Sequence, residues 1–228
     1  MSIDRTTSLP VEWEVTVEAM AETRPRVSYL DPLALPEEIQ EELQPYFQRS
    51  LDNWSAVPRF LRMLGHCPPL VEMWMLFDVK VRQAYLEKDP EYVKVQQLVI
   101  IKTSILNHSI NCTGHNVDLG RSVGLSWEQI DLLVDDGWKR SDLFTEREKA
   151  AIRWAEAVTT HRAKEDEEAF DQMNCHFTER QIVELTFICG LWNCSGRFDA
   201  LHLMVEPPDE RIRFQPGSPR SKDDSHGA

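Results

Sequence analysis

The stretch LVIIKTSILNHSINCTGHNVDLGRSVGLSWEQIDLL, residues 98–133, joins an apolar run to a polar cluster and then to a further amphipathic segment. The run belongs to a segment that begins near Glu91 and repeats aliphatic residues with a helical period, at Val95, Leu98, Ile101 and Ile105. This helix is apolar enough to lie at the centre of the protein. The pattern predicts a second helix from about Ser109 to Val123, with Gly124 as its C-terminal cap.

The rest of the chain also predicts helices. Three Ser/Thr-x-x-Glu/Gln capping boxes, each followed by an apolar face of helical period, begin at Ser126, Thr145 and Thr178 and end at Gln129, Glu148 and Gln181. Upstream, we expect a short helix from Glu37 to Gln48 and another from Leu70 that stops before Pro90. Because no segment alternates apolar and polar residues over more than about four positions, the predicted fold class is all-α.

Length and punctuation predict the domain organisation. A chain of 228 residues, 42% of them hydrophobic, can bury the core of one large domain. Residues 1–36 are interrupted by prolines and are expected to form an N-terminal arm, while residues 37–208 form the helical domain. Residues 209–228 are too polar to bury a core, so we expect a disordered tail.

Charge and composition exclude several classes of protein. The formal net charge of −13, without an evident basic patch, disfavours binding to nucleic acid or to an anionic membrane. We see neither a signal peptide nor an apolar stretch long enough to span a bilayer, and therefore expect a soluble, cytoplasmic protein. The five cysteines lack C-x-x-C spacing, which argues against a disulfide framework.

The polar cluster NHSINCTGHN, residues 107–116, is the candidate functional site. At 3.6 residues per turn, Cys112, His115 and Asn116 share the core-facing side of the predicted helix, and Ser109 lies one turn earlier. Backbone dipoles at a helix N-terminus favour negative charge and can lower the pKa of a thiol. On residue types alone, a buried structural cysteine beside a hydrogen-bonded histidine explains the cluster more simply.

A zinc site is a further alternative for this cluster. His108, Cys112 and His115 have plausible helical spacing for zinc, but no fourth ligand or cysteine pair is evident. We therefore expect neither a metal nor a cofactor.

Four blocks of the sequence together resemble one protein family: SAVPRFLRMLGHCPPLVEMW, the opening stretch, FTEREKAAIRWAEAVTTHRA, and FTERQIVELTFICGLWNCSGRFDALHLMVEPP. They are similar, in this order, to the carboxymuconolactone decarboxylase and alkylhydroperoxidase D superfamily. The resemblance covers roughly residues 30–208. It implies an alkylhydroperoxidase D-like bundle of packed helices that assembles into dimers, trimers or hexamers.

The resemblance carries over to the site only in part. Cys112 falls on the family's peroxide-reactive cysteine, but Ser109 stands where the resolving cysteine would be, so a disulfide cannot form within the motif. Asn116 stands in place of the motif's histidine, and Gln97 in place of the glutamate of the proton relay. His115 lies one position earlier, rotated by about 100° around the helix.

Three functions remain open. In the first, the protein is a cofactor-free decarboxylase, lyase or isomerase acting on a small organic acid or lactone, with His115 as general acid or base and Asn116, Ser109 and Gln97 binding the substrate. In the second, Cys112 is a one-cysteine thiol peroxidase that His115 activates and an external thiol reduces. In the third, the protein is a non-catalytic oligomer. The amide replacements favour the first, because amides keep hydrogen bonding but cannot transfer protons.

A homo-oligomer is expected on a second ground. Trp74, Trp154 and Trp192 are among more large apolar residues than a thin layer of helices can cover. A small-molecule substrate and further copies of the chain are therefore the expected partners.

Overall fold

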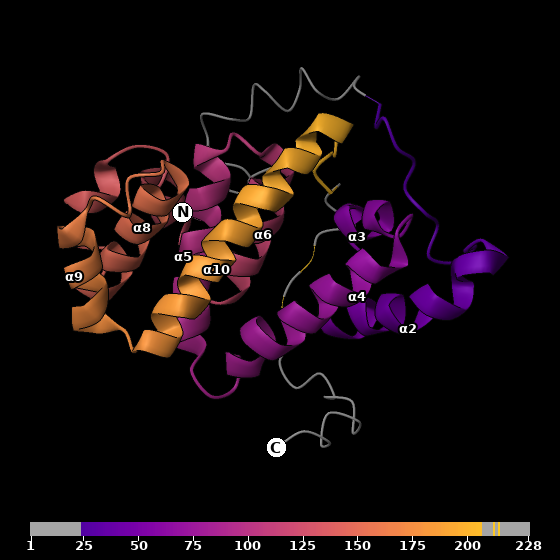
Figure 1. Ribbon diagram of the computed structural model, residues 1–228, viewed down its shortest axis with the longest axis horizontal. Coiled ribbons are helices and arrows are strands. Elements are labelled where there is room, and N and C mark those ends of the chain that lie inside the picture. The colour runs from indigo at the N-terminus through magenta and orange to yellow at the C-terminus, as the bar shows by residue number, and fades with distance from the viewer. Residues whose placement is uncertain (1–23, 207–211, 213, 215–228) are drawn as a thin grey trace.

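The computed structural model describes residues 24–206, 212 and 214, and every regular element in them is a helix (Figure 1), which confirms the all-α class. The α-helices are α2 (Glu37–Trp54), α3 (Arg59–Leu64), α4 (Pro68–Phe77), α5 (Pro90–Leu106), α6 (Ile110–Ser122), α7 (Trp127–Leu132), α8 (Glu146–Thr159), α9 (Glu167–His176) and α10 (Glu179–Ser195). Shorter segments are the π-helical η2 (Asp78–Arg82) and the 3₁₀ turns η3 (Gln83–Tyr85), η4 (Gly137–Lys139) and η5 (Gly196–Leu201). No helix in the described part of the chain is both long and apolar enough to cross a bilayer.

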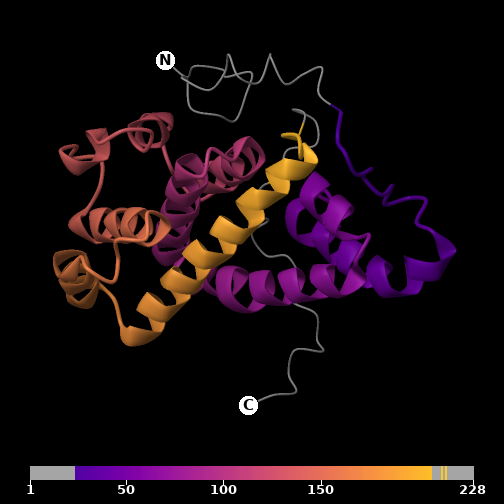
Figure 2. The same cartoon turned by 45° about the horizontal axis from the view of Figure 1, so that its top comes forward.

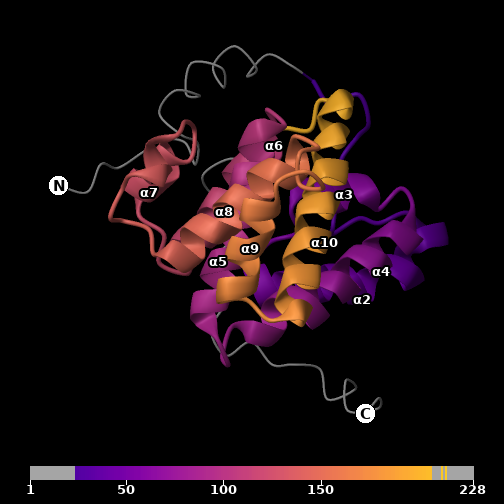
Figure 3. The same ribbon diagram turned by 60° about the vertical axis from the view of Figure 1, so that its left-hand side comes forward.

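Helix α5 is the centre of the molecule. It packs against α6, α8 and α10, which surround it in Figures 1 and 3. From Tyr92 to Ile105 every side chain except that of Lys94 is buried. Because α5 is buried on every side, other elements must cover each of its sides, so α5 determines where its three neighbours pack.

Helices α2, α3 and α4 form a second group, on the other side of α10 from α8 and α9 (Figure 2). Aromatic rings join this group to α10. The ring centroids of Phe60 and Trp74 are 4.6 Å apart, and those of Trp74 and Trp192 are 5.3 Å apart. The second group thereby covers the face of α10 and α6 that α5 leaves open.

The predicted helix starts are confirmed. Ser126, Thr145 and Thr178 each form a complete capping box, in which the hydroxyl accepts a backbone N–H and the side chain three residues later reaches back. The predicted end of α6 is also confirmed, because Gly124 follows it in the left-handed conformation with φ of 97°.

Two predicted helices have different lengths in the structure. Helix α2 continues beyond Gln48 to Trp54, because Leu43, Phe47 and Trp54 continue one buried stripe. The helix expected from Leu70 to Pro90 ends as an α-helix at Phe77 and continues as η2 and η3. The change in helix type accompanies a buried ion pair between Asp78 and Arg82, 2.7 Å apart.

The three tryptophans that predicted an oligomer do not form an exposed patch. Trp74, Trp154 and Trp192 are all buried within the chain, on α4, α8 and α10. The exposed large apolar side chains of α4 and α10 are others: Leu70, Met73, Leu76, Val183 and Phe187. Oligomerisation therefore stays a prediction, without the support of the tryptophans.

The expected disordered tail needs a correction at two positions. Ile212 and Phe214 are buried, and the Phe214 N–H donates to the Ser122 hydroxyl at 3.3 Å. The polar composition of this segment hid two apolar residues that pack on the domain. The rest of residues 209–228, and residues 1–23 of the expected arm, lie outside the described residues.

A carboxylate lies at the start of α6. Asp199 in η5 is partly buried, and this burial raises its pKa to about 6, although the Ser109 hydroxyl and the Ile110 N–H beside it act in the opposite direction. A carboxyl whose pKa is higher in the folded state binds its proton more tightly there. It therefore stabilises the fold most below about pH 4, and this stability is lost as pH rises through about 6.

We expect the isosteric substitution Asp199→Asn to remove this part of the pH dependence. On going from pH 4 to pH 7, the free energy of unfolding of the variant should rise relative to that of the wild type by on the order of 2 kcal/mol, after allowance for solvent screening. Urea unfolding at both pH values measures the difference, with the exposed Asp171→Asn as the control. An equal pH response in Asp199→Asn and the wild type would contradict the assignment.

Two glycines should respond to alanine in opposite directions. Gly124→Ala places a side chain at φ of 97° and should destabilise the protein by about 1 kcal/mol or more. Gly190→Ala lies within α10 in open space, and should stabilise it by about 1 kcal/mol through helix propensity. Urea unfolding followed by circular dichroism measures both, and a loss of stability in Gly190→Ala would show that α10 is misplaced.

Candidate functional site

The site begins at the sharp turn between α5 and α6. His108 adopts a left-handed conformation with φ of 54°, and the Ser109 N–H donates to the Ser104 carbonyl at 3.0 Å. The Ser109 hydroxyl then caps α6 by accepting the Cys112 N–H at 3.4 Å. The turn therefore sets the start of α6, and with it the direction of the side chains in its first two turns.

Cys112 is held in the interior by α10. Its Sγ lies 3.4 Å from the Ser195 hydroxyl, and burial raises the pKa of the thiol to about 11. The hydroxyls of Ser109 and Ser195 lower this pKa. The charges of Asp199 and Glu206 raise it, as burial does, and burial is the largest of these effects. Burial of the thiol therefore opposes the effect that the helix N-terminus can have on its pKa.

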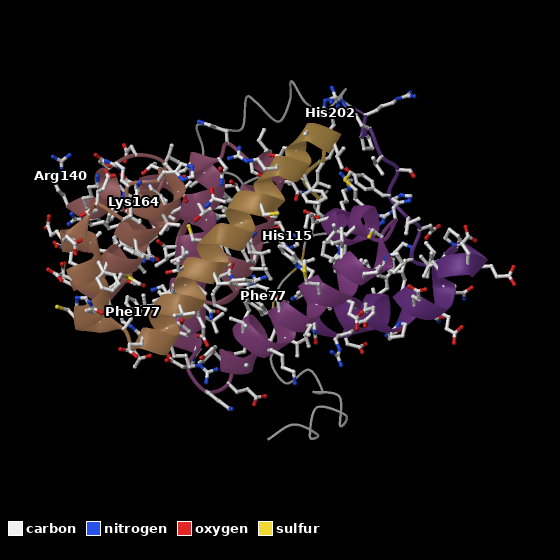
Figure 4. The ribbon with its side chains drawn as sticks, in the orientation of Figure 1. Phe77, His115, Arg140, Lys164, Phe177 and His202 are labelled. Atoms are coloured by element: carbon white, nitrogen blue, oxygen red, sulfur yellow. The ribbon has the colours of Figure 1, made fainter. Side chains whose placement is uncertain are left out.

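Cys112, His115 and Asn116 line one cavity of ≈ 20 Å³, room for about one water molecule. The other lining residues come mainly from α2–α4 and α10: Trp54, Pro58, Phe60, Leu61, Trp74, Arg82, Asn111, Trp192 and Ser195. Figure 4 shows His115 in the interior, where these groups of helices meet. Most of the wall is aromatic or aliphatic, so the polar groups of α6 face a largely dry space.

A buried carboxylate lies beside the imidazole of His115. Its Nδ1 is buried, has no hydrogen-bond partner within the described residues, and lies 3.6 Å from Oε1 of Glu206. The Glu206 side chain is 2% exposed, and the same oxygen accepts the Arg59 N–H at 3.2 Å. An imidazole and a buried carboxylate thus meet beside the cavity.

Arg82 and Asn116 are two further polar residues of the cavity wall. The Asn116 amide donates to the Cys112 carbonyl at 2.8 Å, while its oxygen is 3.5 Å from Nη2 of Arg82. The guanidinium also pairs with Asp78 and lies over the Trp192 ring, 4.9 Å from its centroid. Burial raises the pKa of Asp78, against the opposing charge of Arg82. The arrangement puts hydrogen-bond donors on a face that is otherwise apolar.

Two predicted site residues do not line the cavity. The Ser109 hydroxyl is used as the helix cap. Gln97 is fully buried in α5, and neither polar atom of its amide has a hydrogen-bond partner among the described residues. Nor do His108, Cys112 and His115 come together as ligands: within the described residues, no three His, Cys, Asp or Glu side chains are placed to hold a metal ion.

Sequence reasoning missed Glu206, Arg82 and Ser195. Glu206 lies in the segment VEPP, which contributes to the family resemblance but carries no signal of its own for a site residue. Arg82 interrupts an otherwise apolar helical face between Val81 and Tyr85, and that interruption was a usable signal of a buried charge. Ser195 carried no signal, because only the packing of α10 on α6 places it against Cys112.

A larger cavity, of ≈ 410 Å³, lies along α8 and contains none of the predicted site residues. It is lined mainly by charged side chains of both signs. Arg153 pairs there with Asp166 at 3.1 Å, and Arg162 with Glu156 at 3.2 Å. Because its cations are already paired with acids, we regard this cavity as a solvated surface, and place the chemistry in the smaller one.

Comparisons with known proteins bear on the fold. No protein-family model matches the chain. The uncharacterised protein YnjA of Escherichia coli K12 is 33% identical over 69 residues, which are 30% of this chain and 38% of YnjA. The match thus spans well under half of that relative.

Solved structures match over much more of the chain. A peroxidase-related protein from Silicibacter sp. TM1040 has a TM-score of 0.67 at 16% identity, covering 86% of this chain and all (100%) of the other. The debrominase Bmp8 has a TM-score of 0.58 at 20% identity, covering 75% and 90%. A protein of unknown function from Agrobacterium tumefaciens, suggested to be an AhpD of antioxidant defence, has a TM-score of 0.54 at 26% identity, covering 63% and 94%. These neighbours confirm the resemblance seen in the sequence: the chain has the AhpD-like helical fold of the carboxymuconolactone decarboxylase and alkylhydroperoxidase D superfamily.

Proposed function

We propose that the protein is a cofactor-free acid/base enzyme that acts on a small organic acid or lactone, with His115 as the proton-transfer group. The observation that carries this proposal is the contrast between the two reactive side chains of the cavity. His115 lies beside a buried carboxylate, whereas burial raises the pKa of the Cys112 thiol to about 11. Histidine is the side chain most often used for proton transfer in enzymes, whereas the raised pKa keeps the Cys112 thiol protonated.

The surroundings of His115 suit proton transfer from carbon or oxygen. Apolar walls reduce the local dielectric constant, which strengthens the interaction of a developing anion with nearby donors. The donor available is Nε of Arg82, which has no hydrogen-bond partner among the described residues and whose guanidinium also faces Asn116. Decarboxylation, elimination and isomerisation all pass through such an anion and need no redox partner.

The cavity is closed to a ligand of that size in this conformation. Its ≈ 20 Å³ holds about one water, so a substrate must displace side chains of the wall. Phe60 and Trp74 line the cavity from the α2–α4 group, and their ring centroids are 4.6 Å apart. We therefore propose that substrate enters by displacement of these rings, with α5 and α6 fixed.

A second candidate is thiol chemistry at Cys112. It is favoured by two structural neighbours, the peroxidase-related protein and Bmp8, of which a cysteine-to-alanine variant was captured with 2,3,4-tribromopyrrole. For a peroxide, Sγ of Cys112 would attack the O–O bond, yielding a sulfenic acid and an alcohol, and an external thiol would reduce the sulfur again. Ser109 and Ser195, the hydroxyls nearest to Cys112, cannot resolve a sulfenic acid.

Paired substitutions separate the two candidates. On turnover of small organic acids and lactones, screened by CO₂ release and ring opening, His115→Ala should lower kcat/KM on the order of 10²- to 10⁴-fold, while Cys112→Ser should be mild. The reverse order, with Cys112→Ser inactive and His115→Ala active, would contradict the acid/base proposal. Circular dichroism of both variants controls for loss of the fold.

Peroxide reactivity gives a test that needs no substrate. Because Cys112 is buried with a raised thiol pKa, we expect mild hydrogen peroxide to oxidise it no faster than the exposed Cys67 and Cys175. Mass spectrometry of peptides after a time course measures all three thiols in one sample. Selective oxidation of Cys112 within seconds would instead support the peroxidase.

A further inference from the structure

Three hydrogen bonds hold the segment that follows η5 in place beside α6 and α3. The Met204 N–H donates to the Tyr29 hydroxyl at 3.0 Å, and the Asn111 amide donates to the Met204 carbonyl at 2.7 Å. The Arg59 guanidinium donates to the Val205 carbonyl at 2.7 Å. Three contacts with the backbone of two consecutive residues fix the position of the next residue, Glu206.

The carboxylate of Glu206 is buried beside the imidazole of His115. The Glu206 side chain is 2% exposed, and the partners shown for its Oε1 are the Arg59 N–H at 3.2 Å and Nδ1 of His115 at 3.6 Å. Burying a carboxylate is costly unless charged or hydrogen-bonding groups compensate it. Within the part of the chain that the structure describes, this oxygen faces the backbone N–H of Arg59 and the imidazole of His115.

The contact determines which nitrogen of His115 carries the proton in the neutral ring. If Nδ1 were unprotonated, its lone pair would face a carboxylate oxygen at 3.6 Å, and a buried acceptor would stay unpaired. If Nδ1 is protonated, its N–H faces that oxygen and the interaction is attractive. A separation of 3.6 Å is too long for a good hydrogen bond, and catalytic contacts of this kind often shorten once substrate binds.

We propose that Glu206 is the positioning residue of the site: it holds neutral His115 as the Nδ1–H tautomer, which leaves the lone pair of Nε2 as the base at the cavity. This inference rests on the proposed acid/base function and adds the group that orients its base. In the forward step the bond from substrate carbon or oxygen to hydrogen breaks, and an Nε2–H bond forms. Glu206 stays ionised and stabilises the imidazolium, so charge and protons balance without an electron donor.

The tautomer can be measured without any substrate. In protein labelled with ¹⁵N at its seven histidines, long-range ¹H–¹⁵N correlation distinguishes Nδ1–H from Nε2–H rings at a pH where they are neutral. The His115 signals are identified by their loss in His115→Gln. We expect the wild type to show the Nδ1–H pattern, and an Nε2–H pattern in the wild type would overturn the proposal whatever any variant does.

The isosteric substitution Glu206→Gln tests whether the carboxylate sets the tautomer of His115. It removes the charge and offers an amide that can donate as well as accept, so the His115 signals should move toward the Nε2–H pattern while those of the other histidines stay in place. Glu38→Gln, on the exposed face of α2, is the matched control and should change nothing. An unchanged Nδ1–H pattern in Glu206→Gln would show that the carboxylate does not set the tautomer. If Glu206→Gln does not fold, Glu206→Asp keeps the charge and should keep the Nδ1–H pattern, and its loss there would contradict the proposal.

Activity measurements distinguish a failure of the proposed function from a failure of the role of Glu206. With a substrate in hand, Glu206→Gln should lower kcat on the order of 10²- to 10⁴-fold, as removal of a histidine-orienting carboxylate does, with little change in KM. An Nδ1–H ring in the wild type together with full activity in His115→Ala would refute the proposed function, and leave the tautomer assignment standing. The opposite result, an essential His115 with an Nε2–H ring, would refute the role of Glu206 alone.

Discussion

The burial of α5 on every side is the constraint on which the rest of the structure depends. An amphipathic helix needs one covering layer, whereas α5 needs several, and α6, α8 and α10 provide them. Because α6 follows α5 after a turn of only three residues, it must run back along α5 with its N-terminus at that turn. The polar cluster of the sequence is thereby placed where α6 meets the end of α10, and the site is a consequence of covering α5.

Two physical effects oppose each other at Cys112, and their magnitudes decide the outcome. A helix N-terminus stabilises a nearby negative charge by roughly 0.3–1 kcal/mol, and up to about 2 kcal/mol when partly buried, equivalent to about one pKa unit. Full burial can raise the pKa of an acid by about 3 to 5 units. Cys112 is at the favourable end of α6 but 5% exposed, so its thiol keeps its proton. His115 is the partly exposed member of the cluster, which is one reason why we propose it as the proton-transfer group.

Local sequence signals predicted the helices well and the site only in part. Capping boxes such as that of Thr178, the period of α5 and the glycine after α6 involve residues within a few positions of each other, and each appeared as predicted. The partners of the site are distant in sequence. Cys112 and Ser195 are 83 residues apart, and Arg59 and Glu206 are 147 apart, so no periodicity connects them. The π-helical η2 was missed for a related reason, because it accompanies a buried ion pair that the helical period does not reveal.

The central claim, that the cavity at His115 is the active site and that the imidazole does its chemistry, is tested most directly by a crystal structure with a small planar acid such as benzoate soaked in. We predict that the ligand occupies the cavity, displaces the rings of Phe60 and Trp74, and lies within about 3 Å of Nε2 of His115, with Cys112 unmodified. Benzoate bound elsewhere at saturating concentration, with the cavity still closed, would contradict the claim, as would a Cys112 found oxidised while His115 contacts no ligand.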